Sequence, residues 1–165
     1  MKPDSRQRTG RHAGIHIEEA PVSSLLLQVV RAHALLAAAM FAEVGLVPPQ
    51  EVVILYLDDH GPCHQREIVR FMGRDRSTVT NTLQAMERAG LIIRKPSDAD
   101  GRSLIVVLSD KGRKLAPKVR EVWAEIEAKT TRELDREQLS ALTAALGRLR
   151  EGLAAALDGI SARAP

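Results

Sequence analysis

One short run of side chains is best suited to forming specific hydrogen bonds with a polar partner surface. It is RSTVTN at residues 76–81. Asn bonds adenine through two contacts, Arg favours guanine, and Ser and Thr can bond either kind of base group. A helix surface meant only for solvation would more often carry Glu and Lys. The run therefore predicts close approach to DNA base edges, and its candidate contact residues are Arg76, Ser77, Thr78, Thr80 and Asn81. The longer Arg side chain could reach either a base or a phosphate.

Other polar side chains near this run suit the DNA backbone better than the bases. Phosphate contacts fix the register of a protein on DNA without reading the sequence. We expect such contacts from Arg74, Arg94 and Lys95. Gln65 and His64 could bond a phosphate at the start of a preceding helix, where backbone N–H groups favour an anion. Simple surface charge explains Arg74 and Lys95 equally well.

The residues around the run predict a helix-turn-helix over residues 64–89. HQREIVRFM, residues 64–72, predicts a short helix with His64 at its N-cap position. The tight turn GRD follows, and Asp75 can cap the next helix. The apolar stripe expected on that second helix consists of Val79, Leu83 and Met86. A helix, a short Gly-containing turn and a longer helix form the helix-turn-helix pattern.

Two apolar runs, LIIRK at residues 91–95 and LIVVLS at residues 104–109, predict paired strands around a polar turn. Arg102 lies near the tip of this turn, and a guanidinium suits a narrow minor groove with strong negative potential. An outward-pointing Asp100 would repel phosphates, so we expect it to hold Arg102 or Arg94.

Apolar residues at helical spacing predict helices over about residues 23–43, 49–59 and 110–132, with a last helix after Asp135. The apolar seam of the last helix comprises Leu139, Leu142, Leu146, Leu149 and Leu153. This a/d seam covers two heptads, which is short for a free-standing coiled coil. It indicates either a core helix or a dimer interface. We favour the dimer, because the helix-turn-helix and the paired strands already account for their own small core.

The composition fits a protein of one domain with extensions: 165 residues, of which 44% are hydrophobic and 27% charged. The net charge of +3 mildly favours a nucleic acid partner, and an aromatic content of 2% argues against base-stacking platforms. The single cysteine, Cys63, excludes an intrachain disulfide. We find no signal peptide, and the apolar run LLLQVVRAHALLAAAMF is interpreted as too short to span a membrane. We expect a cytoplasmic protein.

The order of these motifs resembles the MarR family of bacterial transcription regulators. The resemblance rests on GLVPPQ, on REIVRFMGRDRSTVTNTLQAMERAGLIIR, on DADGRS and on VVLSDKG, and it covers about residues 23–157. Each piece alone is weak, but their order and spacing are specific. Two departures bear on DNA sequence preference and affinity: Asn81 stands where many members have Arg, and Gly101 leaves Arg102 without an Arg neighbour.

The resemblance implies a mainly α fold in which a small β-hairpin wing completes a winged helix-turn-helix lobe, with a helical dimerisation region beside it. We expect a flexible tail at residues 1–20, the lobe at residues 49–110 with its wing at 91–109, and dimerisation through residues 21–48 and 111–160. A homodimer would bind a pseudo-palindromic operator of double-stranded DNA, with half-sites ~10 bp apart. Each wing would reach a minor groove.

The family often binds small aromatic or phenolic acids between the dimer helices and the lobe. The residues that could line such an effector pocket are Arg31, His33, Met40, Tyr56, His60, Phe71 and Trp123. Plain packing explains each of them at least as well. By this resemblance the protein would be a repressor released by its effector, and an effector-independent architectural DNA-binding protein is the alternative.

Two further kinds of chemistry have weaker support in the sequence. Cys63 precedes His64 and a helix start, which could activate a redox-sensing thiolate, although an ordinary thiol is the simpler interpretation. The five histidines show no metal-ligand spacing, so we expect no metal and no cofactor. An enzyme is disfavoured, because the sequence has no Gly-rich phosphate loop and no nucleophile motif.

Overall fold

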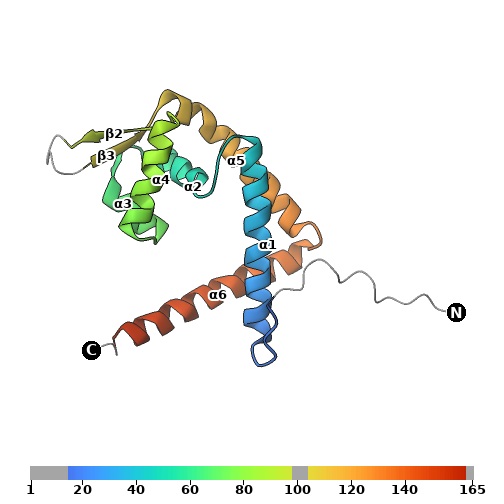
Figure 1. The fold of residues 1–165 in the computed structure, drawn as a ribbon. Coiled ribbons are helices and arrows are strands. Elements are labelled where there is room, and N and C mark those ends of the chain that lie inside the picture. Colours follow the sequence, from blue (N-terminus) through green and yellow to red (C-terminus); the bar gives the residue numbers. More distant parts are fainter. Residues whose placement is uncertain (1–14, 98–103, 163–165) are drawn as a thin grey trace. The chain divides into compact units, whose positions relative to one another are not determined.

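The computed structural model describes residues 15–97 and 104–162 and is mainly α-helical with one small antiparallel sheet (Figure 1). Its elements, in chain order, are α1 (Pro21–Glu43), α2 (Gln50–His60), β1 (Cys63–His64), α3 (Gln65–Met72), α4 (Arg76–Arg88), β2 (Ile92–Pro96), β3 (Leu104–Leu108), α5 (Asp110–Thr131) and α6 (Arg136–Ser161). The predicted fold class is confirmed. The chain divides into two compact units, residues 1–126 and residues 127–165.

The sheet contains one strand that the sequence did not predict. The predicted hairpin is present, since β2 pairs antiparallel with β3 from Ile92 opposite Leu108 to Pro96 opposite Leu104. A third strand, β1, adds to the other edge of β3, with Cys63 opposite Val106. A strand of two residues is too short to show the two-residue alternation that reveals strands in a sequence. This pairing fixes the start of α3 beside the wing.

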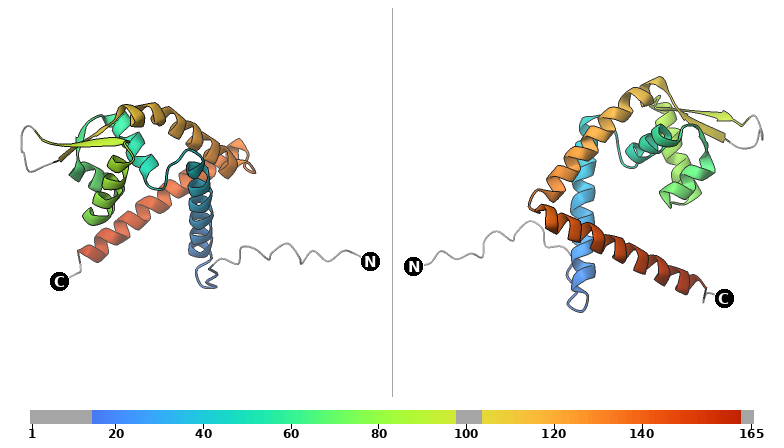
Figure 2. Two further views of the ribbon diagram at one scale, coloured as in Figure 1. Left: turned by 45° about the horizontal axis from the view of Figure 1, so that its top comes forward. Right: turned by 180° about the vertical axis from the view of Figure 1, so that it is seen from behind.

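A single apolar core holds the helix-turn-helix in place. The predicted stripe of α4 is fully buried, since Val79, Leu83 and Met86 are each 0% exposed. Helix α1 contributes only its last turns to this core, through Ala37, Met40 and Phe41. Both views in Figure 2 show α3, α4 and the hairpin gathered where α5 begins. The core therefore buries one face of α4 and leaves the opposite face exposed on the first unit.

Local sequence signals set the ends of the two motif helices. Gly73 ends α3 in the left-handed region at φ 58°, which an L-residue adopts only with strain. Asp75 then caps α4, and its Oδ1 atom accepts a hydrogen bond from the Thr78 backbone N–H at 2.9 Å. At the start of α3, Glu67 accepts from the His64 backbone N–H at 2.9 Å, as in a capping box. These caps fix the short turn between α3 and α4.

Helix α1 begins two residues before the predicted helix of about residues 23–43 and ends at the same residue. It has 23 residues and, by length and composition only, is apolar enough to cross a membrane. The interpretation that this segment is too short was therefore wrong, because the helix extends beyond the apolar run in both directions. Within the predicted tail, the Ile17 backbone N–H donates to Ser24 Oγ of α1 at 2.8 Å. Residues 1–14 lie outside the described residues.

Candidate DNA-binding site

The outward face of α4 carries a row of polar side chains opposite its buried stripe. Positions 77, 81, 84 and 88 repeat at helical spacing, and they hold the exposed side chains of Ser77, Asn81, Gln84 and Arg88. Arg76 is also exposed at the first turn of the helix. Gln84 and Arg88 were missed in the sequence analysis, although the same spacing that buries the stripe would have revealed them. The helix thus presents amide and guanidinium groups on the side that a DNA groove could contact.

The hydroxyl groups at the start of α4 are already bonded within the chain. Ser77 Oγ donates to Asp75 Oδ1 at 2.5 Å, and Thr78 Oγ1 donates to Asp75 Oδ2 at 2.6 Å. These hydroxyl bonds, together with the Thr78 backbone N–H, hold the pKa of Asp75 well below its usual range. The carboxylate is consequently ionised at neutral pH. Ser77 and Thr78 are positioned at the exposed end of the helix, as predicted, but their hydroxyl protons are not free.

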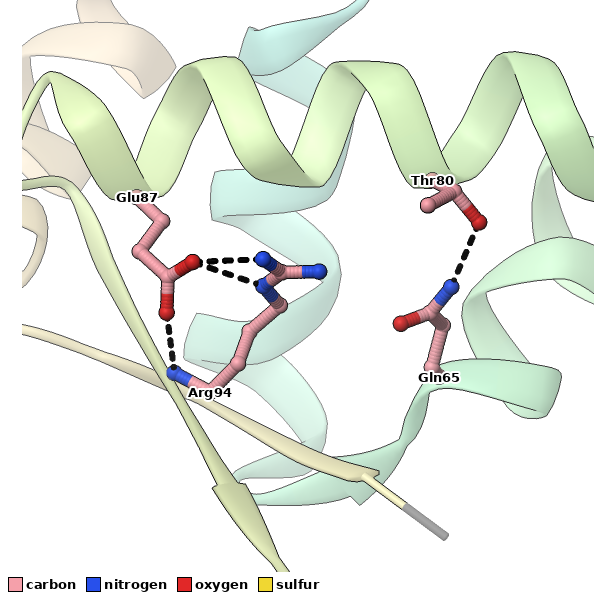
Figure 3. A network of polar contacts seen from close by, with 4 residues as sticks. All are labelled: Gln65, Thr80, Glu87 and Arg94. Carbon is pink, nitrogen blue, oxygen red and sulfur yellow. Dashed lines mark hydrogen bonds and ion pairs between the residues drawn. The ribbon is translucent and has the colours of Figure 1, made fainter.

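Arg94 lies at the root of the wing and pairs with α4, not with solvent (Figure 3). Its Nε and Nη2 atoms donate to Glu87 Oε2 at 3.0 and 2.5 Å, and its backbone N–H donates to Glu87 Oε1 at 3.2 Å. The Arg94 side chain is only 15% exposed. The expected contact of Arg94 with a phosphate stays a prediction. The residue braces strand β2 against α4, a role invisible in the sequence because the ion pair spans seven positions and two elements.

Glu87→Gln should destabilise the first unit at neutral pH by less than about 1 kcal/mol, because the Glu87 side chain is 38% exposed and solvent screens the pair. The bond with Arg94 lowers the pKa of Glu87. Its contribution is therefore present above the unfolded pKa of about 4.3 and is lost as the pH falls through the lower folded value. Urea unfolding at neutral and acid pH measures this difference.

The matched control for this experiment is Glu133→Gln. Glu133 pairs with Arg132, but both side chains are about four-fifths exposed, at 81% and 80%. We expect no measurable change in unfolding free energy from this substitution at either pH. An equal loss in both variants, or a loss in Glu87→Gln that persists at acid pH, would contradict the bracing role of the Glu87–Arg94 pair.

A second contact joins α3 to α4 on the same side (Figure 3). Gln65 Nε2 donates to Thr80 Oγ1 at 2.8 Å, while Thr80 Oγ1 donates its own proton to the Arg76 carbonyl at 2.7 Å. Because the only hydroxyl proton of Thr80 is used, Gln65 must present its NH₂ group to it. Gln65 and Thr80 are thus bonded to one another, and their predicted DNA contacts stay predictions.

The two contacts flank a cleft of about 520 Å³ between α3, α4 and the wing. The side chains that line it are His64, Gln65, Arg66, Val69, Arg76, Thr80, Gln84, Arg94 and Leu104. Gln65 Oε1 is buried without a hydrogen-bond partner among the described residues. Arg66 and Arg76 make this cleft attractive to an anion, whereas the charge of Arg94 is balanced by Glu87. Arg66 was not predicted, although it follows Gln65 directly.

The structure describes only some of the other residues that were predicted to contact the DNA backbone or the minor groove. Arg74 lies exposed in the turn before α4, and Lys95 lies exposed on β2. Both are available to a phosphate, and both are equally consistent with plain surface charge. Arg102 and Asp100 fall within residues 98–103, outside the described residues. Their predicted pairing therefore stays a prediction.

The predicted effector residues do not gather in one place. Tyr56 stacks on His60 and packs against Phe71, with ring centroids 4.4 Å apart in both pairs. His33 stacks separately against Trp123 at 6.1 Å. Of the other two candidates, Met40 is buried in the core and Arg31 is exposed on α1. The described residues therefore form two aromatic clusters, not a single pocket wall. None of the residues predicted for the effector lines the cleft beside α4.

Cys63 is a buried thiol in strand β1, with 7% of its surface exposed. Burial, together with the nearby Glu67 charge, raises its pKa to about 11. This direction does not support the alternative in which a neighbouring histidine and a helix start lower the pKa, and it agrees with the ordinary thiol. Among the described residues there is also no group of three His, Cys, Asp or Glu side chains that could hold a metal ion.

Cys63 should consequently be inert as a redox sensor. We expect alkylation of the folded protein by iodoacetamide at pH 7 to be at least about tenfold slower than that of free cysteine, because the thiolate is the reacting form. The rate should rise only as the pH approaches the raised pKa. Mass spectrometry of the labelled protein over time measures it, with urea-unfolded protein as the control. Rapid labelling of the folded protein would contradict this account.

Comparison with known proteins agrees with this geometry. The sequence profile of the MarR family matches residues 44–103, which span the helix-turn-helix and most of the wing. The HTH-type transcriptional regulator MgrA of Staphylococcus aureus is 27% identical over 110 residues, 67% of this chain and 74% of MgrA. These matches identify residues 44–103 as a MarR-type winged-helix region and support a MarR-family regulator. A second relative, the uncharacterised HTH-type transcriptional regulator YfiV of Bacillus subtilis, is 28% identical, and the match spans 59% of this chain and 61% of YfiV.

Solved structures show the same MarR fold. A probable transcriptional regulator from Pseudomonas aeruginosa superposes with a TM-score of 0.72 at 28% identity, covering 79% of this chain and 98% of the other. A mutant MarR from E. coli, solved in complex with operator DNA, reaches a TM-score of 0.74 at 17% identity, covering 80% of this chain and 95% of the other. The relatives and the fold are those of transcription regulators, not of enzymes.

Proposed function

We propose that the chain is a homodimeric repressor that binds a pseudo-palindromic DNA operator in the cytoplasm. The observation that carries this proposal is the outward face of α4. It presents Arg76, Ser77 and Asn81 to solvent, while the opposite stripe is fully buried. Asn and Arg are the side chains that distinguish adenine and guanine in the major groove. Arg74 and Lys95, both exposed, would contact phosphates, and Arg102, which lies outside the described residues, would reach the minor groove.

The exposed apolar side chains of α6 support a second copy of the chain as the partner. Leu142, Leu146, Leu149, Leu153, Leu157 and Ile160 are each between 42% and 67% exposed. They repeat at spacings of three and four and so form one stripe, which continues the predicted seam by two residues. A contiguous apolar stripe of this kind marks an interaction surface. Pairing of two copies would cover it and would place two α4 helices on one DNA duplex.

Selection from a random duplex pool tests the function directly. We expect the full chain to enrich a two-fold symmetric site, with half-sites separated by about one helical turn. Footprinting on the enriched site should then show two protected major-groove segments. Equal affinity for enriched and unselected duplexes would overturn the proposal of a sequence-specific regulator.

We further propose that a small aromatic or phenolic acid releases the DNA. The observation that favours such a ligand is the half-buried ring of Trp123, which lies between His33 of α1 and Phe41, 5.3 Å away in the core. A structural neighbour at 23% identity, BpsR of Bordetella bronchiseptica, is described as regulated in its DNA binding by 6-hydroxynicotinic acid. Binding near the α1–α5 contact could change the separation of the two α4 helices, so that both half-sites lose contacts.

Trp123 is the only tryptophan of the chain, so its fluorescence reports on this region. We expect an effector to change this fluorescence over the same concentration range in which it releases labelled operator DNA. A His33→Ala variant should bind the effector more weakly while retaining operator affinity. If no member of a panel of aromatic acids changes either signal, an effector-independent DNA-binding protein is the better description.

A further inference from the structure

The hydroxyl groups of α4 share a property that constrains what they can recognise. The helix has four, and each donates its only proton to another group of this chain. Ser77 and Thr78 donate to the Asp75 carboxylate, Thr80 donates to the Arg76 carbonyl, and Thr82 donates to the Thr78 carbonyl at 3.1 Å. A hydroxyl has one donor and two acceptor lone pairs. Toward an external partner, these oxygens can therefore only accept.

Ser77 and Thr78 are the two of this set that are exposed at the first turn. Asp75 is ionised and has no proton of its own, so neither bond can reverse direction. The hydrogen bonds are short, at 2.5 and 2.6 Å, as is usual for a hydroxyl that donates to a carboxylate. A phosphate oxygen or a base carbonyl is also an acceptor and cannot bond to them without breaking these contacts.

Base amino groups are the matching donors. In the major groove, adenine offers its N6 amino group and cytosine its N4 amino group, whereas guanine and thymine present acceptors. We propose that Ser77 and Thr78 select adenine or cytosine over guanine or thymine on the strand that they face, and that Asp75 is the positioning residue that makes them acceptors. This inference rests on the proposed function, in which α4 enters the major groove.

The structure offers a substitution that reverses one hydroxyl and spares the other. Asp75 Oδ1 accepts from the Thr78 backbone N–H and from the Ser77 hydroxyl, whereas Oδ2 accepts from the Thr78 hydroxyl. In Asp75→Asn the amide oxygen retains the two bonds at Oδ1, and the NH₂ group takes the place of Oδ2. The Thr78 hydroxyl must then accept from that group, which frees its proton to point outward. Ser77 is unchanged and serves as an internal control.

The experiment is selection from a random duplex pool with the full chain, in parallel with Thr78→Val, Ser77→Ala and Asp75→Asn. For the unsubstituted chain we expect adenine or cytosine at the positions facing these residues. Thr78→Val should remove that preference at one position of each half-site, with an affinity loss of about three- to tenfold for the preferred site. Ser77→Ala should do the same at a different position. Asp75→Asn should shift the Thr78 position toward guanine or thymine and leave the Ser77 position as it was.

The outcomes distinguish a failure of the proposed function from a failure of this inference. If the unsubstituted chain enriches no site, the proposed function fails, and this inference fails with it. If it enriches a site whose base preferences are the same in Thr78→Val and Ser77→Ala, the chain binds DNA but its hydroxyls do not read amino groups. A preference for guanine or thymine opposite Thr78 in the unsubstituted chain would also overturn the inference. Thermal unfolding confirms that each variant is folded, and the two hydroxyl deletions decide the question if Asp75→Asn does not fold.

Discussion

Glutamate at both Leu149 and Leu153 of α6 should convert the proposed dimer to a monomer. The two side chains lie in the middle of the apolar stripe, 43% and 57% exposed in the single chain. Pairing of two copies would place four carboxylates in an apolar interface, and an unpaired charge there costs several kcal/mol. Light scattering at micromolar concentration measures the mass. A partner would cover this exposed apolar stripe of the second unit. The change in molecular mass should therefore be among the largest effects that we expect.

Loss of the dimer should also abolish tight operator binding. A dimer holds two recognition helices on one duplex, so the second contact is made at a high effective concentration. We expect the affinity of the monomer for a two-half-site duplex to fall at least about 100-fold. Its affinity for an isolated half-site should change little, because α4 lies in the first unit.

The matched control places the same charges on the other side of the helix. Ala144 and Ala155 are exposed and lie on the face of α6 away from the leucine stripe, by the 3.6-residue period. Glutamate at both positions should leave the mass and the operator affinity unchanged. If the stripe variant stays dimeric, or the control dissociates equally, α6 is not the dimer interface.

Gly112→Ala should be the most destabilising small substitution in the first unit. Gly112 is buried in the first turn of α5, where a Cβ atom would lie 2.2 Å from the Leu91 carbonyl oxygen. That oxygen belongs to the backbone between α4 and the wing, and it accepts a hydrogen bond from Ser109 N at 3.0 Å. The neighbouring Lys111 Nζ bonds the Ala89 carbonyl at 2.8 Å. Because neither backbone segment can yield freely, we expect a loss of about 1–3 kcal/mol or more in urea unfolding.

The same substitution at a second glycine should change the free energy of unfolding in the opposite direction. Gly147 lies in α6 off the leucine stripe, and a Cβ atom there would meet nothing within 4 Å. Gly147→Ala should stabilise the chain by about 0.5–1 kcal/mol, because alanine restricts the unfolded backbone and favours helix. Equal effects of the two substitutions would show that the packing of α5 against Leu91 is looser than described.

Much of this molecule follows from sequence pattern because one physical signal dominates each element. The stripe of Val79, Leu83 and Met86 predicts both that α4 is a helix and which side of it is buried. Asp75 and Gly73 mark the turn before it because only a few residue types cap a helix or adopt a positive φ. The paired strands follow from apolar runs on either side of a polar turn.

The pairings between elements could not be predicted in the same way. Arg94 and Glu87 were both visible as charged residues, but their ion pair depends on how strand β2 packs on α4. The bond between Gln65 and Thr80 depends on the packing of α3 on α4. The effector prediction gathered aromatic residues by type, and the fold separates Tyr56 from Trp123 into different clusters. Short strand β1 left no signal at all.

The most direct test of the DNA-binding role of α4 compares operator affinity in Arg76→Ala with that in Arg148→Ala. Both residues are exposed and both substitutions remove one positive charge, but Arg148 lies in α6. Fluorescence anisotropy with the selected duplex at several salt concentrations gives the affinities and their salt dependence. We expect a loss of roughly 5- to 150-fold for Arg76→Ala, equivalent to about 1–3 kcal/mol, and almost none for Arg148→Ala. Equal affinities of the two variants at every salt concentration would contradict this expectation.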